Sequence, residues 1–405
     1  MDERAVNAFR GAMKMAAATL ANAPGREITV VHHNDTDGIT SGAILRNSLT
    51  RAGFAVENIP IERVHPAFLP AIHRPERRLI LYADLGGQSA DVISRQMTGG
   101  SRVIILDHHL PAAGVFPGLL QVNPEDFGID GDGQCAAAAA ACFFALALDE
   151  GNEDLAALAV LGALGDHQTA GGRFAGLNAI LAGTAVKRGD LRPEGTDDAA
   201  VWLIPRLGGR TLREADGLLL SLAVNGYYRG GADLALEACL NGPNERTLAF
   251  SAEMAAIQED RFGRELARIR REGLPRTGLI AWNDVGERFH PLGLKAIGLF
   301  CEEILREGLA DGDCYVAGFQ SFPQENPYLG RFAGGEAKVS FRVTPGLKSA
   351  IGRGERPDLM RLLPGPVQKV GGFAEACHRF SAACTIPEAR AADLVAILAD
   401  RAAGL

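Results

Sequence analysis

The chain has 405 residues, of which 47% are hydrophobic and 22% are charged. This composition is ordinary for a folded globular protein and argues against a disordered chain. Because a single core rarely grows beyond about 250–300 residues, we expect two domains or three. The formal net charge is −8, which excludes coating of nucleic acid by bulk positive charge. A nucleic-acid ligand would need a local groove or metal ions.

The cysteine content and the N-terminus indicate a cellular location. The seven cysteines include no C-x-x-C pair, which predicts reduced thiols rather than a disulfide framework. The first 25 residues begin with acidic side chains and have an amphipathic pattern, so they predict a helix rather than a signal peptide. No apolar run reaches the roughly 20 residues that a membrane span needs. We therefore expect a cytoplasmic protein with no membrane partner.

The first 170 residues alternate strand-like apolar segments with helical patterns, which predicts an α/β fold with a parallel sheet. Four segments are interpreted as buried parallel strands: Glu27–His32, Arg78–Ala83, Val103–Leu106 and the stretch 158–166 that enters Asp166. The Ala, Leu and Gly composition of the last stretch suits a helix as well. Ligand sites in such sheets form outside the carboxyl ends of the strands.

The remainder of the chain divides into a helical region and a second α/β region. Residues 212–273 are helical in pattern, and the charged run Gln258–Glu272 is typical of a solvated connecting helix. Beyond Pro275 we expect strands over Leu279–Trp282, Cys314–Phe319 and Lys338–Val343, and helices over Pro291–Leu305 and Glu388–Ala403. These elements predict a second, smaller α/β domain.

Side chains that can bind metals follow each of the four predicted strands. They lie in His32–Gly38 (HHNDTDG), Asp84–Gly87 (DLGG), Asp107–His109 (DHH) and Gly165–His167 (GDH), which together hold five of the nine histidines. Carboxylates and imidazoles without a thiolate suit Mn²⁺ or Mg²⁺ better than a structural zinc. Two ions about 3.5–4 Å apart need roughly six protein ligands and a bridging carboxylate. The four segments supply that number.

Each segment alone has a simpler interpretation. Asp-Thr-Asp-Gly is typical of a turn, Asp84-Leu-Gly-Gly of a corner after a strand, and Asp166 of a helix cap. Asp107–His109 is harder to explain in this way, because three adjacent ionisable residues after a strand need solvent or a ligand. The four segments together, in order and after apolar strands, favour a metal centre.

In these motifs the sequence resembles the DHH phosphoesterase superfamily, and within it the RecJ-like and nanoRNase-like branch with a C-terminal DHHA1 domain. The resemblance rests on His33-x-Asp35-x-Asp37-Gly38-Ile39-Thr40-Ser41, Asp84, Asp107-His108-His109 and Asp166. It implies a DHH domain over residues 1–242, a connecting helix over 243–274 and a substrate-binding domain over 275–405. The active site would lie in the cleft between the two domains.

The resemblance also implies a role for each motif residue. One metal ion would be held by His33, Asp35 and Asp84, and the other by Asp37, Asp84, His108 and Asp166, with Asp84 bridging. His109 would face the scissile phosphate and bind it or protonate the leaving oxygen, while Asp107 would orient a ligand imidazole. His32 and His167 would be neighbours of the site. The implied cofactor is two divalent ions, Mn²⁺ first, with Mg²⁺ and Co²⁺ as alternatives.

Three further stretches resemble the substrate-binding parts of the family. Asn225-Gly-Tyr-Tyr-Arg229 resembles a RecJ-type segment whose arginine is expected near substrate phosphate, although a salt bridge at a helix end would also explain Arg229. The stretches 338–342 and 376–387 resemble the DHHA1 domain, which makes Arg342 and His378 expected substrate contacts. Ala376 and Cys377 stand where glycines are usual.

The expected activity is metal-dependent hydrolysis of short RNA or DNA to mononucleotides, in the manner of nanoRNases. A RecJ-like single-strand exonuclease is the alternative; that type usually carries an OB-like domain, and the sequence offers no leftover segment of that size. Cyclic dinucleotides and 3′-phosphoadenosine 5′-phosphate stay open as substrates, as does homodimerisation. A type II pyrophosphatase would carry a basic Ser-Arg-Lys-Lys motif in its C-terminal domain, and nothing like it appears in this sequence. A non-catalytic scaffold would be expected to lose metal ligands, whereas all six ligand positions are intact here.

Overall fold

A computed structural model of the chain describes residues 2–21, 25–195 and 198–404, without the side chains of residues 21, 375 and 376. It divides into two compact units, the first comprising residues 1–223 and 230–252 and the second residues 224–229 and 253–405. The helix expected at the N-terminus is α1 (Glu3–Ala21); Met1 and residues 22–24 lie outside the described residues. None of the described helices is both long and apolar enough to span a membrane. The expected cleft between two domains stays a prediction.

The first unit is built on a five-stranded parallel sheet with the order β2-β1-β3-β4-β5. Its strands are β1 (Glu27–His33), β2 (Ala55–Ile61), β3 (Leu79–Ala83), β4 (Arg102–Leu106) and β5 (Leu119–Val122). Three of the predicted strands are thereby confirmed as β1, β3 and β4. The strands β2 and β5 were not predicted, because Glu57 and Pro60 interrupt the apolar pattern of β2 and because β5 has only four residues.

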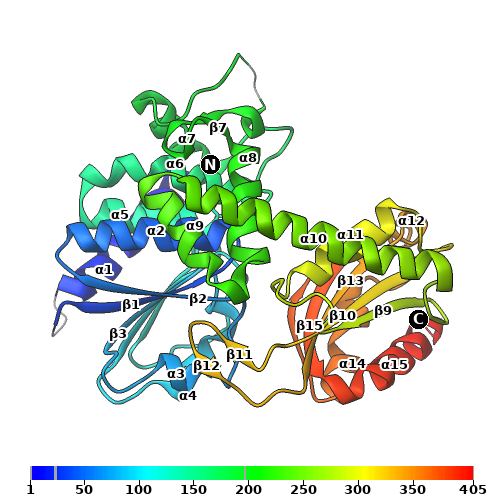
Figure 1. The fold of residues 1–405 in the computed structure, drawn as a ribbon. Coiled ribbons are helices and arrows are strands. Elements are labelled where there is room, and N and C mark those ends of the chain that lie inside the picture. The colour runs from blue at the N-terminus through cyan, green and yellow to red at the C-terminus, as the bar shows by residue number, and fades with distance from the viewer. Residues whose placement is uncertain (1, 22–24, 196–197, 405) are drawn as a thin grey trace. The chain divides into compact units, whose positions relative to one another are not determined.

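The strand order reverses between β1 and β3. After β1 the chain passes to β2 on one side, and it then returns to β3 on the other side. Helices α2 (Thr36–Arg51) and α5 (Ala137–Leu148) cover one face of the sheet, while α3 (Leu69–Ile72) and α4 (Ala90–Gln96) lie on the other (Figure 1). The carboxyl ends of β1 and β3 therefore form a topological switch point, where ligands bind in open α/β sheets.

Small residues let α2 pack close to β1. A Cβ atom at Gly38 would lie 2.3 Å from the carbonyl oxygen of His33, and one at Gly42 would lie 2.6 Å from the His32 ring. Neither distance is compatible with a side chain, so these two positions require glycine. The result is a helix with 12 of its 16 residues buried, which holds its first turn rigidly at the switch point.

The fourth predicted strand is wrong, because residues 156–165 form helix α6 (Ala156–Gly165) and Asp166 is its C-cap. All residues of this helix from Ala156 to Ala163 are buried. A helix that is apolar on every side lacks the periodicity that would separate it from a buried strand. Asp166 therefore reaches the switch point from a helix end and not from the sheet.

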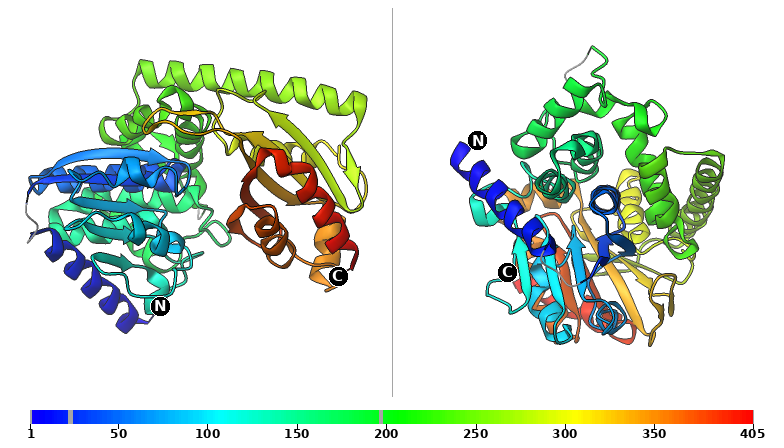
Figure 2. Two further views of the ribbon diagram at one scale, coloured as in Figure 1. Left: turned by 90° about the horizontal axis from the view of Figure 1, so that it is seen from below. Right: turned by 90° about the vertical axis from the view of Figure 1, so that its left-hand side faces the viewer.

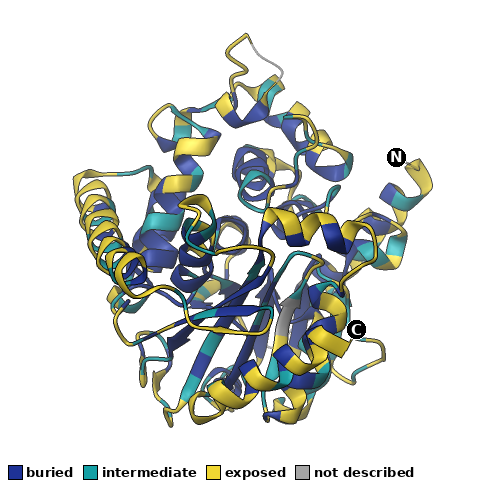
Figure 3. Ribbon diagram, turned by 90° about the vertical axis from the view of Figure 1, so that its right-hand side faces the viewer, coloured by how far each residue is buried: buried dark blue, intermediate teal, exposed yellow. Residues whose placement is uncertain are grey.

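Helices dominate the middle of the chain, as the pattern over 212–273 predicted. They are α7 (Gly176–Arg188), α8 (Leu212–Leu219), a π-helical turn (Leu220–Asn225), a 3₁₀ turn (Tyr227–Arg229), α9 (Gly231–Asn241) and α10 (Glu245–Glu272), with a small hairpin of β6 (Leu203–Ile204) and β7 (Arg210–Thr211) between α7 and α8. The division between the units falls inside α10, at residues 252 and 253. Figure 3 shows the broad exposed face of α10, while Phe262, Leu266 and Ile269 are buried on its other side.

The second unit contains a six-stranded mixed sheet with the order β14-β15-β13-β10-β9-β8. Its strands are β8 (Arg276–Thr277), β9 (Ile280–Gly286), β10 (Tyr315–Ser321), β13 (Glu336–Val343), β14 (Phe373–Cys377) and β15 (Ser381–Pro387); β11 (Glu325–Asn326) and β12 (Gly330–Arg331) form a separate hairpin. Only β9 and β10 pair in parallel. This arrangement confirms a second α/β unit.

Helices cover both faces of this second sheet. They are α11 (Ala296–Arg306), α12 (Pro345–Gly352), α13 (Leu359–Leu362), α14 (Pro364–Lys369) and α15 (Ala391–Gly404). Alternate residues of β13, namely Ala337, Val339 and Phe341, enter a core shared with α12 to α15. The intervening Ser340 and Arg342 lie toward α11, where a Cβ atom at Gly298 would be 3.3 and 3.2 Å from them. The C-terminal helix α15 packs beside β8 and β9 (Figure 2).

Candidate metal centre

The loop between β1 and α2 supplies three of the predicted ligands. His33 is the last residue of β1, and Asp35 is the N-cap of α2, where its Oδ1 accepts a hydrogen bond from the Gly38 amide at 3.0 Å. Asp37 lies in the first turn of the same helix. Carboxylates at a helix N-terminus are stabilised by the free amides and by the helix dipole, so this turn favours two acidic side chains.

Asp84 follows β3 and has an unusual backbone. Its φ is 62°, in the left-handed region that few residues other than Gly, Asn and Asp adopt. The amide of Asp84 donates to the carbonyl of Leu106 at 3.1 Å, and Gly86 continues the corner with a φ of 104°. The Asp84-Leu-Gly-Gly sequence is thus a corner after a strand, and this corner also turns a carboxylate toward the ends of β1 and β4.

The predicted ligands form two groups that meet at Asp84. In the first group, His33 Nδ1 lies 3.0 Å from Asp35 Oδ2 and 3.2 Å from Asp84 Oδ2. In the second group, His108 Nε2 lies 3.4 Å from Asp84 Oδ1, 3.5 Å from Asp166 Oδ2 and 4.0 Å from Asp37 Oδ2. Each oxygen of Asp84 therefore faces a different group, which is the placement that a carboxylate between two ions requires.

The imidazole of His108 tests whether these residues fit a cation. Its Nδ1 lies 2.8 Å from the carbonyl oxygen of Gly131, which can only accept, so Nδ1 carries a proton. In the neutral ring Nε2 then presents a lone pair to three carboxylates, and it makes no hydrogen bond of good geometry in the described part of the chain. Lone pairs facing one another in a buried site need a positive charge between them. The donor set of four carboxylates and two imidazoles fits hard or borderline divalent ions such as Mn²⁺.

The electrostatics of the cluster lead to the same conclusion. Burial, together with the negative charges of Asp84 and Asp166, raises the pKa of the Asp37 carboxyl well above its usual value. Burial also raises the pKa of Asp166. Burial alone would lower the pKa of His108, but the carboxylates of Asp166, Asp84 and Asp37 raise it well above the ordinary value. Without a bound cation, the cluster retains protons to limit its own repulsion.

Asp37 is held in place by the N-terminus of α5. Its Oδ2 accepts from the Ala137 amide at 2.8 Å and its Oδ1 from the Ala138 amide at 2.9 Å. Helix α6 approaches this pair closely because Gly162 has no side chain; a Cβ atom there would lie 2.4 Å from Asp37 Oδ1. The carboxylate is therefore fixed by three helices, although residues 37, 137 and 162 are far apart in the sequence.

Gln168 is a part of the site that the motifs did not indicate. Its Nε2 donates to the Gly131 carbonyl at 2.7 Å and to Asp166 Oδ2 at 2.8 Å, and its Oε1 accepts from Asn178 at 2.7 Å. One amide thus positions both a predicted ligand and the carbonyl that fixes the His108 tautomer. Its place directly after Gly165–His167 was the one available signal, because Gly131 and Asn178 are distant from it in the sequence.

Asp107 and His109 form a pair beside the cluster. Asp107 Oδ1 accepts from His109 Nδ1 at 2.8 Å and from the His108 amide at 2.8 Å, and its Oδ2 accepts from the Gly87 amide at 2.8 Å. The expectation that Asp107 orients a ligand imidazole is wrong in its partner, because the Gly131 carbonyl holds His108 and Asp107 holds His109. Burial opposes ionisation of Asp107, yet His109, His108 and the backbone amides hold the pKa of its carboxyl far below the usual range.

His109 is the more accessible member of that pair. Its side chain is 38% exposed, and burial lowers its pKa less than the Asp107 carboxylate raises it. Its ring lies 4.3 Å from that of His108, centroid to centroid. With Nδ1 directed to Asp107, only Nε2 is left to meet a ligand.

His32 and His167, which were expected to be neighbours of the site, differ in exposure. His32 is fully buried with its Nδ1 2.8 Å from the His33 carbonyl, and His167 is exposed.

The four predicted substrate contacts lie in the second unit. Asn225 Nδ2 donates to Gln258 at 2.6 Å, while Arg229 donates to Glu253 at 2.5 Å. The salt bridge that would explain Arg229 structurally is therefore present. Arg342 pairs in the same way with Glu302 at 2.8 Å.

His378 is exposed at the turn between β14 and β15. The neighbouring Cys377 ends β14, and the side chain of Ala376 lies outside the described part of the chain. A role in substrate binding stays a prediction for Asn225, Arg229, Arg342 and His378.

Comparison with known proteins finds similar sequences for the first unit. Residues 27–165 match the profile of the DHH family, N-terminal domain. The uncharacterized protein MJ0831 of Methanocaldococcus jannaschii is 32% identical over 148 residues, which are 35% of this chain and 33% of that protein. The match thus spans about a third of the curated relative's length.

Solved structures extend the fold similarity to the whole chain. RecJ from Thermus thermophilus in complex with Mn²⁺ is 21% identical, with a TM-score of 0.64 over 97% of this chain and 55% of that chain. An exonuclease RecJ bound to manganese is 20% identical, with a TM-score of 0.60 over 97% of this chain and 95% of that one. At such identities the likeness shows a shared fold.

The fold and the site together define the class of protein. An α/β domain holds two neighbouring groups of His and Asp side chains at the switch point of its sheet, and a second α/β unit follows it. Residues 27–165 match the N-terminal domain of the DHH family, and the whole chain shares its fold with the RecJ structures.

Proposed function

We propose that this protein is a two-metal phosphodiesterase that hydrolyses short oligonucleotides to mononucleotides. One observation carries the proposal: Asp84 directs one carboxylate oxygen to His33 at 3.2 Å and the other to His108 at 3.4 Å. A carboxylate shared between two such groups is the feature that two-metal hydrolases use to hold a pair of ions.

The six predicted ligands would hold two divalent ions, with Mn²⁺ first and Mg²⁺ or Co²⁺ as alternatives. His33, Asp35 and Asp84 would form one set, and Asp37, Asp84, His108 and Asp166 the other. When bound, such ions supply Lewis-acid stabilisation of charge on the phosphoryl oxygens and activation of water near neutral pH. The donor chemistry of the cluster, which contains no thiolate, supports this assignment.

His109 would position the substrate phosphate. Its Nδ1 donates to Asp107, which fixes the ring and favours the protonated imidazole. Its Nε2–H would then donate a hydrogen bond to a phosphate oxygen or pass a proton to the leaving oxygen. Asp107 acts on the substrate only through His109, because its other contacts are with backbone amides.

The net charge supports a short nucleic-acid substrate. The net charge of −8 disfavours long-range attraction of a polyanion, so binding would depend on local contacts. Arg342 and His378 would supply such contacts from the second unit. The proposal includes RNA or DNA as the partner, a cytoplasmic location in keeping with seven free cysteines, and the option of a homodimer.

The test is hydrolysis of 5′-labelled RNA and DNA of two, five and twenty-five nucleotides with Mn²⁺. The matched control is Asp84→Asn, which keeps the left-handed backbone and removes the shared charge. We expect turnover of the shortest chains by the wild type and none by the variant.

Other outcomes would redirect or overturn the proposal. Processive loss from the longest strand would favour a RecJ-like exonuclease. Hydrolysis of cyclic dinucleotides or of 3′-phosphoadenosine 5′-phosphate alone would change the substrate class. Inactivity on every phosphoester, with Mn²⁺ bound, would overturn the catalytic proposal and favour a scaffold.

A further inference from the structure

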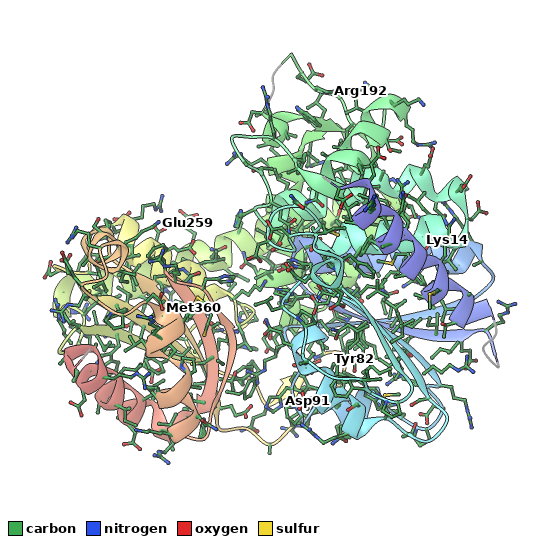
Figure 4. All side chains as sticks on the ribbon, turned by 180° about the vertical axis from the view of Figure 1, so that it is seen from behind. Lys14, Tyr82, Asp91, Arg192, Glu259 and Met360 are labelled. Carbon is green, nitrogen blue, oxygen red and sulfur yellow. The ribbon has the colours of Figure 1, made fainter. Side chains whose placement is uncertain are left out.

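The second unit contains a hollow of ≈ 800 Å³ that belongs to no predicted site. It lies where the end of α12, the segment that leads to α13, the residue after His378 and the helix α15 come together. The charged residues that line it are Arg353, Arg356, Arg361, Arg379, Arg401 and Asp358. Met360, labelled in Figure 4, marks the neighbouring helix α13. With five guanidinium groups and one carboxylate, the hollow carries net positive charge, whereas the predicted metal centre is acidic.

Two of the five arginines are already balanced by carboxylates. Arg353 pairs with both oxygens of Glu355 at 2.7 Å, and Arg379 lies 3.6 Å from Asp358. Asp358 also caps α13 by accepting from the Arg361 amide at 3.0 Å. These contacts fix the rim of the hollow and leave its remaining charge unbalanced.

The other three arginines form no hydrogen bond or ion pair with a carboxylate within the described part of the chain, although Arg356 is near enough to Glu355 for a longer-range attraction. Arg356 donates at 3.4 Å to the Ala402 carbonyl, and Arg401 donates at 2.8 Å to the Arg361 carbonyl. The guanidinium of Arg361 has no hydrogen-bond acceptor among the described residues. These three exposed guanidinium groups around one hollow form a positive patch on a protein of net charge −8, and such a patch attracts anions.

The geometry favours phosphate over a single carboxylate. A guanidinium binds phosphate through two parallel N–H···O bonds, and a phosphate monoester carries about two charges and three acceptor oxygens. The volume falls within the roughly 300–1,000 Å³ of small-molecule sites. A discrete hollow of this size accommodates a nucleotide, whereas an extended groove would indicate a long strand.

We propose that this hollow binds the phosphate monoester of a nucleotide, either free or at the 5′ end of a short strand. None of its lining residues is a predicted metal ligand or substrate contact. The proposal therefore holds or fails independently of the proposed hydrolysis. It adds a second phosphate site to the unit that follows the DHH domain.

The experiment is calorimetric titration of the full chain with AMP and with adenosine, in EDTA so that no metal ion takes part. We expect the wild type to bind AMP and not adenosine. Arg356→Gln/Arg361→Gln should weaken AMP binding at least tenfold with an unchanged thermal midpoint, because these exposed side chains make only one hydrogen bond, at 3.4 Å, with the rest of the described chain. Arg264→Gln/Arg306→Gln removes the same charge from exposed arginines of α10 and α11 and should bind AMP as the wild type does.

Further arms separate the sources of phosphate and the failure modes. Competition with AMP by a 5′-phosphorylated pentanucleotide, and not by its 5′-hydroxyl form, would assign the hollow to a strand end; competition by neither would assign it to a free nucleotide. Arg361→Gln/Arg401→Gln should reproduce the loss. Asp84→Asn should bind AMP normally while losing hydrolysis. Absence of AMP binding, equal binding of adenosine or of an acidic hexapeptide, equal competition by both pentanucleotides, or AMP binding unchanged in Arg356→Gln/Arg361→Gln would overturn the proposal.

Discussion

Asp84 must satisfy a backbone requirement and a chemical one at the same position. Its φ of 62° suits Asp, Asn or Gly, and its two oxygens face two different groups. Substitutions at Asp84 can therefore separate the charge from the conformation.

The first prediction concerns Asp84→Asn and Asp84→Ala. Both should lower the Mn²⁺-dependent rate on a dinucleotide at least about a hundredfold, because both remove the shared charge. Only the alanine variant adds backbone strain, so it should be less stable than the asparagine variant by about 1 kcal/mol. Urea unfolding in EDTA measures the second effect. Undiminished hydrolysis by Asp84→Asn would falsify the bridging role.

The second prediction concerns Gln168, which positions Asp166 and the Gly131 carbonyl. Gln168→Leu should raise the Mn²⁺ concentration needed for half-maximal activity about 10- to 100-fold, as loss of an outer contact to a metal ligand commonly does. A Mn²⁺ titration of activity checks it. Gln96→Leu, at an exposed position of α4, is the control and should leave the titration unchanged. A normal metal requirement in Gln168→Leu would remove this residue from the site.

At the scale of elements, Gly162 lets α6 lie against α2 and α5. A Cβ atom there would be 2.4 Å from Asp37 and 2.5 Å from the Cβ of Ala138. Gly162→Ala should destabilise the protein by about 1–3 kcal/mol, since the helices must separate. Gly183→Ala, on an exposed position of α7 with nothing within 4 Å, should instead stabilise it by about 0.5–1 kcal/mol. Urea unfolding of the two variants tests the contrast, and effects of the same sign would contradict it.

A buried histidine makes the sheet sensitive to acid. His73 lies 2.8 Å from the hydroxyl of Tyr82, a residue of β3 that is labelled in Figure 4, and burial lowers the pKa of His73 to about 4. The unfolded chain, with a histidine pKa of about 6.5, binds a proton that the folded chain refuses, so stability falls as the pH drops from 6.5 toward 4. His73→Gln should make this slope shallower by at most about 1 kcal/mol per pH unit. Free energies of unfolding between pH 7 and pH 5 measure it, and identical slopes would contradict the assignment.

The elements differ in how well the sequence predicts them, for physical reasons. The strands β1, β3 and β4 are continuous apolar runs rich in Val, Ile and Leu, which a buried parallel strand requires. The helix α6 is equally apolar and equally buried, so the same rule predicted a strand. The predicted ligands lie together because each stands at the end of an element that reaches the switch point. Gln168 and Gly131 could not be predicted, because their roles depend on contacts between distant segments.

At the scale of the whole molecule, the first unit holds a cluster that is unfavourable without a cation. The pKa of Asp37 is raised by burial and by Asp84 and Asp166, which shows that the carboxylates repel one another. Metal binding and stability should therefore be linked. Mn²⁺ at about 100 times its dissociation constant should stabilise the protein by about 2.7 kcal/mol, seen as a rise of a few degrees in the thermal midpoint relative to EDTA.

A single substitution in the cluster should raise stability in EDTA and remove most of the stabilisation by Mn²⁺. Asp166→Asn removes one charge from the cluster, so its thermal midpoint in EDTA should exceed that of the wild type, while its response to Mn²⁺ should be largely lost. Scanning calorimetry in both buffers checks the pair of effects. A variant that is less stable in EDTA would show that Asp166 is held by its hydrogen bond to Gln168 more than it is repelled by its neighbours.

The left-handed backbone at position 84 also restricts how descendants of this protein can diverge. A relative without the proposed hydrolysis would be free to replace His33 or Asp166 by many residues, but position 84 would still favour Asp, Asn or Gly, which fit the corner after β3 without strain. Inherited loss of activity should thus leave Asn or Gly there as its mark. Among related genes, Asn or Gly at this position would therefore mark chains that kept the corner without the shared charge.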